Sequence, residues 1–290
     1  MLQLLDGKAT ALQIKEEIAN EVRSLTAQGH RAPHLAAVIV GTDGASMTYV
    51  ANKEKASHEV GFTSSVYRMS ETTTEKQLLE TIEFLNNDPD IDGFIVQLPL
   101  PKHIDEQRVI NAISPDKDVD GFTPVNIGRM VLGEECFTPA TPMGICTLLR
   151  RYGIETAGKH CVVLGRSNIV GTPVANLLSR KGFDCTVTMC HSKTQNLKAL
   201  TLQADILVVA IGKAEFVTAD MVKEGAVLVD VGIHRVEDAT KKNGYRVIGD
   251  VKHGEVDAKC SWVTPVPGGV GPLTIVSLLQ NTMQAYRKRL

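Results

Sequence analysis

The sequence predicts an α/β protein of two domains, and three observations carry this prediction. Short apolar, β-rich runs alternate with segments whose apolar residues recur at helical spacing, which is typical of parallel βαβ units. A glycine turn at residues 165–171 joins one such run to the start of a helix. The chain has 290 residues, about the length at which a single core stops growing.

The predicted elements follow in order along the chain. Apolar residues at helical spacing predict a first helix that stops before Gly29 and a second at residues 46–60, while Thr72 and Glu75 form a predicted capping box for a third. Residues 114–142 are expected to be a loop-rich junction. Further helices are expected at residues 144–152, from Gly171 onward and at 273–287, and strands at residues 35–40, 64–69, 91–98, 161–164, 186–189, 206–210, 226–231 and near 246–251.

Composition and charge narrow the class of protein. The net charge of −2 provides no basic field for nucleic acid or for a membrane surface, so a small-molecule partner is expected. No segment approaches the ~20 apolar residues of a membrane span, and the apolar run in the first ten residues is too short for a signal peptide, so none is expected. The six cysteines are scattered without a C-x-x-C pair, which favours buried reduced thiols, no metal site and a cytoplasmic location.

The turn at residues 165–171 is suited to a phosphorylated cofactor. Gly165 lets the chain turn after an apolar strand, and Gly171 and Pro173 open a helix whose free N–H groups attract phosphate. The pattern G-x-S-x-x-x-G departs from the usual G-x-G-x-x-G, so an ordinary glycine turn stays an alternative. The next strand runs into His191, Ser192 and a lysine with no carboxylate, and Arg166 lies in the turn itself. This combination favours NADP over NAD.

Three segments of the first half carry candidate catalytic groups. Tyr49 and Lys53 are four residues apart and share a helical face, Gln97 ends an apolar strand, and Asp118 and Asp120 lie in a loop bounded by glycine. A solvated lysine and a turn-forming aspartate are the structural alternatives. Their places at helix and strand ends, where α/β proteins bind ligands, favour a functional interpretation.

Seven segments of the chain carry a further pattern. They are S-x-x-Y-V-x-x-K at 46–53, VQLPLP at 96–101, KDVDGF at 117–122, P-x-T-P-x-G at 139–144, GRSNIVG at 165–171, GDV at 249–251 and PVPGGVGP at 265–272. Together these segments resemble the bifunctional methylenetetrahydrofolate dehydrogenase/methenyltetrahydrofolate cyclohydrolase family. One small departure is Ala140, where many relatives have cysteine.

The resemblance implies oxidation of 5,10-methylenetetrahydrofolate by NADP⁺ and hydrolysis of the methenyl product to 10-formyltetrahydrofolate, in one-carbon metabolism and purine biosynthesis. It implies that Lys53 is the general base or proton relay for the water, a role that needs the uncharged amine. Gln97 is expected to orient Lys53, Tyr49 to stack on or hydrogen-bond the pterin, and Asp120 to accept hydrogen bonds from the pterin ring. A monofunctional dehydrogenase, a non-catalytic NADP-binding regulatory protein and an NADP-dependent oxidoreductase acting on shikimate-like acids are the alternatives.

The resemblance also implies an arrangement of domains around a cleft. A folate-binding domain of residues 1–142 is completed by a C-terminal helix at 272–290 that packs back on it, and a Rossmann-type NADP-binding domain spans residues 143–271. Pro267, Gly268 and Gly269 are expected to line the cleft near substrate and nicotinamide, and the chain to form a homodimer through its cofactor domains. The implied cofactor-binding residues are Gly165, Arg166, Ser167, Ile169, Val170, Gly171, His191, Ser192 and Ile233.

Overall fold

The computed structural model describes residues 2–241 and 244–290, and they divide into two compact units. Unit 1 comprises the residues up to Ala11 together with Thr141–Thr274, and unit 2 comprises Leu12–Ala140 and Ile275–Leu290. Both units combine parallel strands with helices, which confirms the predicted α/β class. The predicted domain boundaries, which place residues 1–11 differently, stay a prediction.

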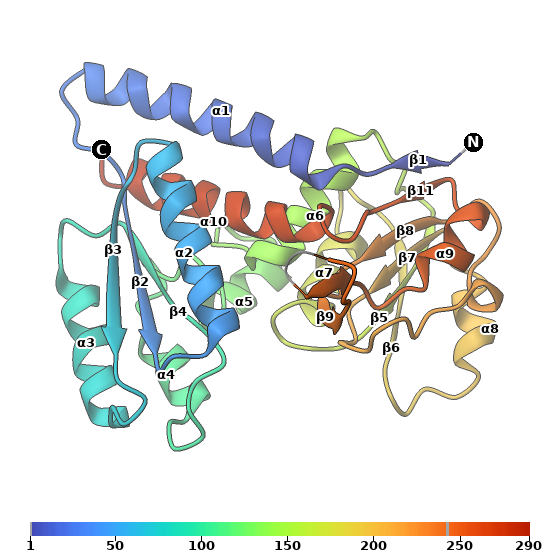
Figure 1. The fold of residues 1–290 in the computed structure, drawn as a ribbon. Coiled ribbons are helices and arrows are strands. Elements are labelled where there is room, and N and C mark those ends of the chain that lie inside the picture. Colours follow the sequence, from blue (N-terminus) through green and yellow to red (C-terminus); the bar gives the residue numbers. More distant parts are fainter. Residues whose placement is uncertain (1, 242–243) are drawn as a thin grey trace. The chain divides into compact units, whose positions relative to one another are not determined.

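Unit 2 is built on a three-stranded parallel sheet in the order β3-β2-β4 (Figure 1). Side chains of α3 and α4 pack on one face of this sheet, around Val38, Leu78, Ile82 and Phe94. Its strands are β2 (His34–Val40), β3 (Thr63–Met69) and β4 (Gly93–Val96), and its helices are α1 (Gly7–Ala27, which starts in unit 1), α2 (Gly44–Glu59), α3 (Glu75–Asn87), α4 (Glu106–Ala112) and α5 (Pro124–Leu132).

Three expectations for unit 2 need correction. The capping box of α3 is formed by Thr74 and Gln77, because the Gln77 side chain reaches back to the backbone N–H of Thr74; Glu75 is already the first helical residue. The expected loop at 114–142 contains helix α5, which Thr123 caps and Gly133 ends in a left-handed conformation. The strand β4 ends at Val96, so Gln97 lies just beyond it.

Unit 1 is built on a six-stranded parallel sheet in the order β1-β11-β8-β7-β5-β6. The chain runs outward from β5 in both directions, to β6 on one side and to β7 on the other, so the sheet has its topological switch point at β5. The elements are β1 (Gln3–Leu4), α6 (Ala140–Arg151), β5 (His160–Leu164), α7 (Gly171–Ser179), β6 (Thr186–Cys190), α8 (Leu197–Thr201), β7 (Ile206–Val209), η1 (Ala219–Met221), β8 (Val227–Asp230), β9 (His234–Glu237), β10 (Tyr245–Ile248), α9 (His253–Val256), η2 (Asp257–Lys259) and β11 (Trp262–Val263).

The strand expected near residues 246–251 does not join the main sheet. It is β10, which pairs antiparallel with β9 in a separate two-stranded sheet. The main sheet instead continues with the two-residue strand β11 and then with β1 from the start of the chain. Such short strands carry too little pattern to be predicted, because partners distant in sequence determine them.

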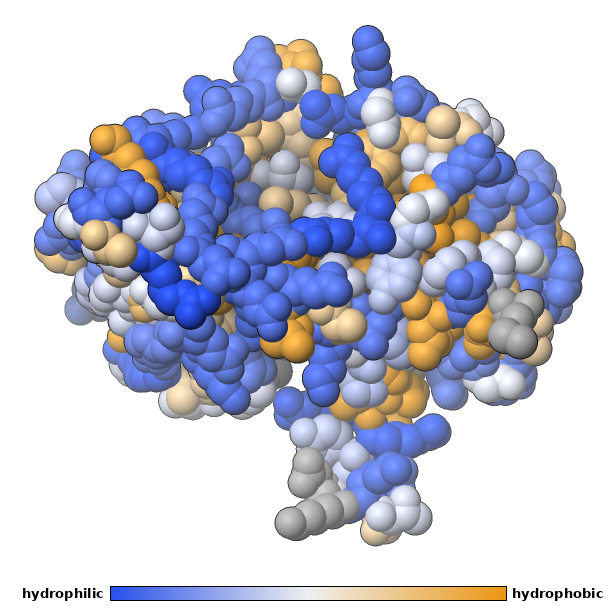
Figure 2. All heavy atoms as spheres, turned by 90° about the horizontal axis from the view of Figure 1, so that it is seen from above, coloured by the Kyte–Doolittle hydropathy of each residue, from blue (hydrophilic) through white to orange (hydrophobic). Residues whose placement is uncertain are grey.

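The last helix, α10 (Val270–Arg287), begins in unit 1 and continues into unit 2. Within unit 2 its Asn281 amide donates to the carbonyl oxygens of Val119 and Thr138, at 2.8 and 2.9 Å. The face drawn in Figure 2 is largely hydrophilic, with small separate hydrophobic areas. Among the residues described, none of the helices combines the length and the apolar character that crossing a bilayer requires.

Candidate functional site

Lys53 and Gln97 meet in unit 2. Helix α2 begins after Asp43, whose carboxylate accepts the N–H of Ser46, and Lys53 lies two turns further on. The Lys53 side chain is buried, and its Nζ lies 3.2 Å from Oε1 of Gln97. The other end of the Gln97 amide donates to the carbonyl oxygen of Leu98 at 2.7 Å, so the amide oxygen is directed at the lysine. A lysine amine that is buried and hydrogen-bonded to a neutral amide is typical of a functional site and not of a solvated protein surface.

Asp120 is held close to Lys53 by a loop that Asp118 organises. The buried Asp118 carboxylate accepts the backbone N–H groups of Gly121, Phe122 and Thr123, at 3.0, 3.1 and 2.7 Å. Burial raises the pKa of the Asp120 carboxyl, and the positive charge of Lys53 partly offsets this rise. Asp118 therefore shapes the turn, while Asp120 is an ionisable group placed within electrostatic reach of the lysine.

Tyr49 lies one turn before Lys53 on α2, with its side chain 40% exposed. The adjacent Val50 is fully buried, so the helix turns Val50 inward and leaves the tyrosine ring accessible. An accessible ring next to a buried amine offers a stacking surface for a planar ligand. Tyr49, Lys53, Gln97 and Asp120 thus all belong to one unit, as a shared site requires.

The glycine turn after β5 is a tight backbone crossing in unit 1. A methyl group on Gly165 would lie 2.1 Å from the carbonyl oxygen of Ala210, and Gly165 also has a φ of +115°. A methyl group on Gly171 would lie 2.3 Å from the carbonyl oxygen of Gly165. The Ser167 hydroxyl accepts the N–H groups of Val170 and Gly171 at 3.2 and 3.3 Å. The first turn of α7 is therefore brought up against the end of β5, at the switch point of the sheet.

The other predicted cofactor residues follow the same edge of the sheet. Arg166 and Ser192 are exposed after β5 and β6, and the N–H of Gly165 joins these two strand ends by donating to Cys190 at 2.9 Å. The Nδ1 of His191 accepts the N–H of Lys193 at 3.2 Å, which fixes the backbone after β6. Accessible arginine and serine side chains beside a helix start fit a phosphorylated nucleotide.

Two exposed isoleucines add an apolar surface at this edge. Ile169 and Ile233 are 41% and 49% exposed, although both are large and hydrophobic. A methyl group on Gly271 would lie 3.5 Å from Cδ1 of Ile233, which places Ile233 beside the start of α10. Apolar side chains combined with phosphate-binding groups are typical of a dinucleotide site.

Sequence reasoning missed two buried aspartates that tie the strand ends of unit 1 together. The Asp250 carboxylate accepts the N–H groups of Ile211 and Gly212 at 2.8 and 2.9 Å, and Nε2 of His234 lies 2.7 Å from it. The Asp230 carboxylate accepts the N–H groups of Gly232, Asp250 and Val251, at 2.9, 3.0 and 3.0 Å. The motif GDV at residues 249–251 marks this place in the sequence, but the motif alone assigns no role to Asp250.

A histidine extends this network to α9. Burial lowers the pKa of His253, but hydrogen bonds to Asp230 and Asp257 outweigh burial and leave that pKa raised. The backbone of Gly249 packs directly against the Asp230 carboxylate, because a methyl group on Gly249 would lie 1.8 Å from Oδ2 of Asp230. The turns after β7 and β8 are thus set by buried carboxylates.

The predicted substrate loop Pro267, Gly268 and Gly269 lies in unit 1, between β11 and α10. Gly268 has a φ of +111°, and a methyl group on Gly269 would lie 2.7 Å from the carbonyl oxygen of Pro265. Glycine is therefore required at both positions, at Gly268 by its backbone conformation and at Gly269 by the close approach of the Pro265 carbonyl oxygen.

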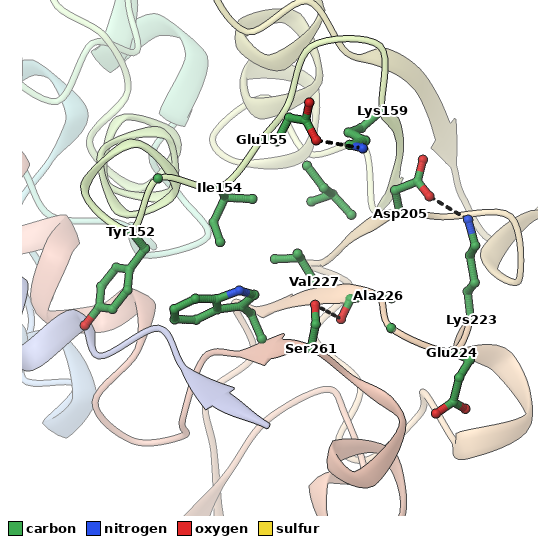
Figure 3. A pocket seen from close by; sticks show the side chains of 14 residues that line it. Tyr152, Ile154, Glu155, Lys159, Asp205, Lys223, Glu224, Ala226, Val227 and Ser261 are labelled. Carbon is green, nitrogen blue, oxygen red and sulfur yellow. Dashed lines mark hydrogen bonds and ion pairs between the residues drawn. The ribbon is translucent and has the colours of Figure 1, made fainter. Parts of the chain in front are cut away.

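A pocket of about 370 Å³ lies at the opposite, amino-terminal edge of the unit 1 sheet (Figure 3). Its two lysines are engaged by carboxylates, Lys159 by Glu155 at 2.9 Å and Lys223 by Asp205 at 2.5 Å. Both lysines of the pocket are thus paired with carboxylates, and the pocket lies away from the cofactor residues. Among residues 2–241 and 244–290, no group of three His, Cys, Asp or Glu side chains is arranged to hold a metal ion.

Two models of one protein family together match nearly the whole chain. Residues 5–120 match the model of the tetrahydrofolate dehydrogenase/cyclohydrolase catalytic domain, and residues 139–290 match that of the NAD(P)-binding domain of the same enzymes. A protein of Cytophaga hutchinsonii named bifunctional protein FolD is 63% identical over 286 residues, which cover 98% of this chain and 99% of that protein.

Two solved structures extend the similarity to the fold. The bifunctional methylenetetrahydrofolate dehydrogenase/cyclohydrolase of Campylobacter jejuni has a TM-score of 0.94 and 45% identity, with 100% of both chains covered. The Trypanosoma brucei enzyme complexed with NADP and an inhibitor has a TM-score of 0.94 and 37% identity, covering 99% of this chain and 98% of that one.

Proposed function

Because the chain belongs to the tetrahydrofolate dehydrogenase/cyclohydrolase family, we propose which of its residues carry out the two reactions. The protein is a bifunctional enzyme that oxidises 5,10-methylenetetrahydrofolate with NADP⁺ and hydrolyses the 5,10-methenyl product to 10-formyltetrahydrofolate. NADP⁺, when bound, accepts the hydride. The residues of the chain bind and orient both molecules and move a proton in the second step.

The observation that carries the assignment is the buried pair of Lys53 and Gln97, with Nζ 3.2 Å from Oε1. In its uncharged form, the Lys53 amine donates one N–H to Gln97 and keeps its lone pair for the water that attacks the methenyl carbon. Gln97 is the positioning residue, because its own amide is fixed on Leu98. Lys53 thus takes a proton from the attacking water.

Tyr49 and Asp120 bind the folate in this proposal. The accessible ring of Tyr49 stacks on the pterin, and the Asp120 carboxylate accepts hydrogen bonds from the pterin donors. The support is their common unit and the closeness of Asp120 to the Lys53 charge. Both residues bind substrate in either reaction.

Cofactor binding belongs to the carboxyl edge of the unit 1 sheet. Arg166 and Ser192 bind the 2′-phosphate that distinguishes NADP from NAD, and Pro267, Gly268 and Gly269 form the wall for substrate and nicotinamide. Two observations support this assignment of the cofactor site: the close backbone contact at Gly165 and the exposure of the Arg166 side chain. The remaining cofactor contacts come from Gly165, Ser167, Ile169, Val170, Gly171, His191 and Ile233.

The test is Lys53→Met in the full-length enzyme. Cyclohydrolase activity should fall by ~10²- to 10⁴-fold, the usual contribution of a general base, while dehydrogenase activity stays measurable, so methenyltetrahydrofolate accumulates. NADPH formation and the methenyl absorbance report the two steps separately. The control is Lys55→Met on the exposed side of the same helix, which should match wild type. Equal losses of both activities, or none, would remove Lys53 from the proton transfer.

We further propose that the protein works as a cytoplasmic homodimer without a nucleic-acid partner. Its support is the family resemblance and the net charge of −2, which gives no basic field. Light scattering on the purified protein across a tenfold dilution tests the dimer. A monomer mass at every concentration would refute it.

A further inference from the structure

The first residues of the chain run alongside the strand that leads into the glycine-rich loop. In unit 1, Gln3 and Leu4 pair with Trp262 and Val263 of β11 (Figure 1), and the N–H of Leu5 donates to the carbonyl oxygen of Val263 at 2.8 Å. Leu5 is fully buried. The N-terminal segment thus forms the edge strand of the sheet, and it places the start of α1 beside the loop of Pro267, Gly268 and Gly269.

The start of α1 presses directly on that loop. The N–H of Lys8 donates to the carbonyl oxygen of Gly268 at 2.8 Å. A methyl group on Gly7 would lie 1.7 Å from the carbonyl oxygen of Gly269 and 2.6 Å from its carbonyl carbon. Gly7 has an ordinary helical backbone conformation, which any amino acid could adopt. Glycine is required there only because the loop backbone comes so close.

A hydroxyl group also fixes this start. The Tyr152 hydroxyl accepts the N–H of Asp6 at 3.0 Å, and the ring of Tyr152 meets Trp262 edge to face with centroids 5.5 Å apart. The Asp6 carboxylate caps the helix by accepting the N–H of Ala9 at 2.9 Å. The residue before Gly7 therefore has little freedom to move away from the loop.

The opposite side of the loop is fixed by β8. The Thr264 hydroxyl accepts the N–H of Asp230 at 2.8 Å, and the N–H of Thr264 donates to the carbonyl oxygen of Leu228 at 3.0 Å. The loop is thus held between the end of β8 and the start of α1. A change of volume at Gly7 is transmitted to the backbone of Gly268 and Gly269, because neither side yields easily.

We infer that Gly7 is a positioning residue for hydride transfer, one that sets the place of the Gly268–Gly269 backbone through direct backbone contact. The inference rests on the proposed function, which assigns the wall for substrate and nicotinamide to this loop. Gly7 itself touches neither molecule. Hydride transfer depends more steeply on alignment than hydrolysis does, because two bound reactants must meet.

The experiment is Gly7→Ala in the full-length enzyme. Displacing an aligning group by about 1 Å costs up to ~100-fold in rate, so the kcat of the dehydrogenase should fall by ~10- to 100-fold. The ratio of dehydrogenase to cyclohydrolase activity should fall as well, and this ratio does not depend on the fraction of folded protein. The Kd for NADP should stay within about twofold, since the turn after β5 is untouched. The matched control is Gly128→Ala, a helical glycine with open space around it, which should keep the wild-type ratio.

The outcomes separate the inference from the proposed function. Wild-type enzyme without activity on methylenetetrahydrofolate would refute the function itself. Active wild type with an unchanged activity ratio in Gly7→Ala would overturn only the role of Gly7. If Gly7→Ala fails to fold, Tyr152→Phe replaces it, because that change removes the hydroxyl that accepts the Asp6 N–H at 3.0 Å and donates to the Asp6 carbonyl oxygen at 3.4 Å. A lowered ratio in Tyr152→Phe at unchanged Tm supports the inference, and a wild-type ratio overturns it.

Discussion

Asp118 and Asp120 stand two residues apart in one loop, and their carboxylates have different surroundings. Burial raises the pKa of both, but Asp118 is surrounded by hydrogen-bond donors, including Nδ2 of Asn126 at 2.9 Å. In the described part of the chain, no group donates a hydrogen bond to Asp120. The two residues look alike in the sequence motif, and only the fold separates the turn former from the group left for a ligand.

The raised pKa of Asp120 predicts an acid-side loss of folate binding. Only the ionised carboxylate accepts two hydrogen bonds, so the KM for methylenetetrahydrofolate should rise as the pH falls toward that pKa. The rise should begin at a higher pH than for an exposed aspartate. Asp120→Asn should raise the KM at neutral pH by ~10- to 100-fold, as expected for losing charge-assisted hydrogen bonds worth about 1.5–3 kcal/mol.

The KM of both forms is measured between about pH 5 and pH 8, on protein shown to be folded. In Asp120→Asn the acid-side rise should be absent, because the titrating group is gone. A rise of equal size in the variant would assign the titration to another group.

The exposed Arg166 side chain is expected to make the enzyme prefer NADP over NAD. Arg166→Ala should weaken NADP binding by ~10- to 100-fold, because a charge-assisted phosphate contact contributes about 1.5–3 kcal/mol. NAD lacks the 2′-phosphate, so its KM should not change, and the control Arg246→Ala, exposed on β10, should leave both values unaltered. Steady-state kinetics with the two cofactors measures this. Equal effects on NADP and NAD would mean that Arg166 contacts a part common to both.

At the scale of elements, helices such as α1 and α2 and buried strands such as β5 were predicted from local patterns, whereas helix α5 and the two-residue strands β1 and β11 were not. The apolar spacing of α1 and the β-rich run of β5 are local signals that survive in the fold. Helix α5 was missed although Thr123, Pro124 and Gly133 mark its ends, because prolines and glycines in that region read as turns. The site residues Lys53 and Gln97 could be named from the sequence, but their 3.2 Å contact depends on the packing of α2 beside the sheet.

The turns that follow β7 and β8 depend on Asp250. Oδ2 of Asp250 accepts both the Ile211 and the Gly212 N–H, and Asp250→Asn replaces these two charge-assisted hydrogen bonds by bonds to a neutral amide oxygen, so the Ile211–Gly212 turn should loosen. Hydrogen bonds to a charged group contribute about 1.5–3 kcal/mol, against about 0.5–1.5 kcal/mol for neutral ones. We expect weaker NADP binding by ~5- to 100-fold with an unchanged KM for folate, measured by calorimetric titration of NADP and by kinetics.

The control for this change is Asp220→Asn, because Asp220 is an exposed aspartate of the same unit. Asp220→Asn should bind NADP as wild type does. Wild-type affinity in Asp250→Asn would show that the buried network does not reach the cofactor edge.

At the scale of the whole chain, each unit is completed by a segment distant in sequence. The first residues add β1 to unit 1, and residues 275–290 complete unit 2. In unit 2 the Tyr286 ring is buried, and its hydroxyl donates to the carbonyl oxygen of Arg31 at 2.6 Å. Local patterns cannot reveal such closures, because the partners lie more than 250 residues apart.

This arrangement predicts that the two units can be destabilised separately. Tyr286→Ala removes a fully buried aromatic ring from unit 2, which costs about 3–5 kcal/mol in the free energy of unfolding. Phe84→Ala removes an aromatic ring of the same unit that is 57% exposed, and should change stability by no more than about 0.5 kcal/mol. Calorimetric unfolding with and without NADP should show a lowered transition for unit 2 in Tyr286→Ala, while the transition that NADP stabilises stays near its wild-type temperature. Folate turnover should therefore be lost on warming before NADP binding is lost. A single transition in which both disappear together would mean that unit 1 does not hold its fold without unit 2.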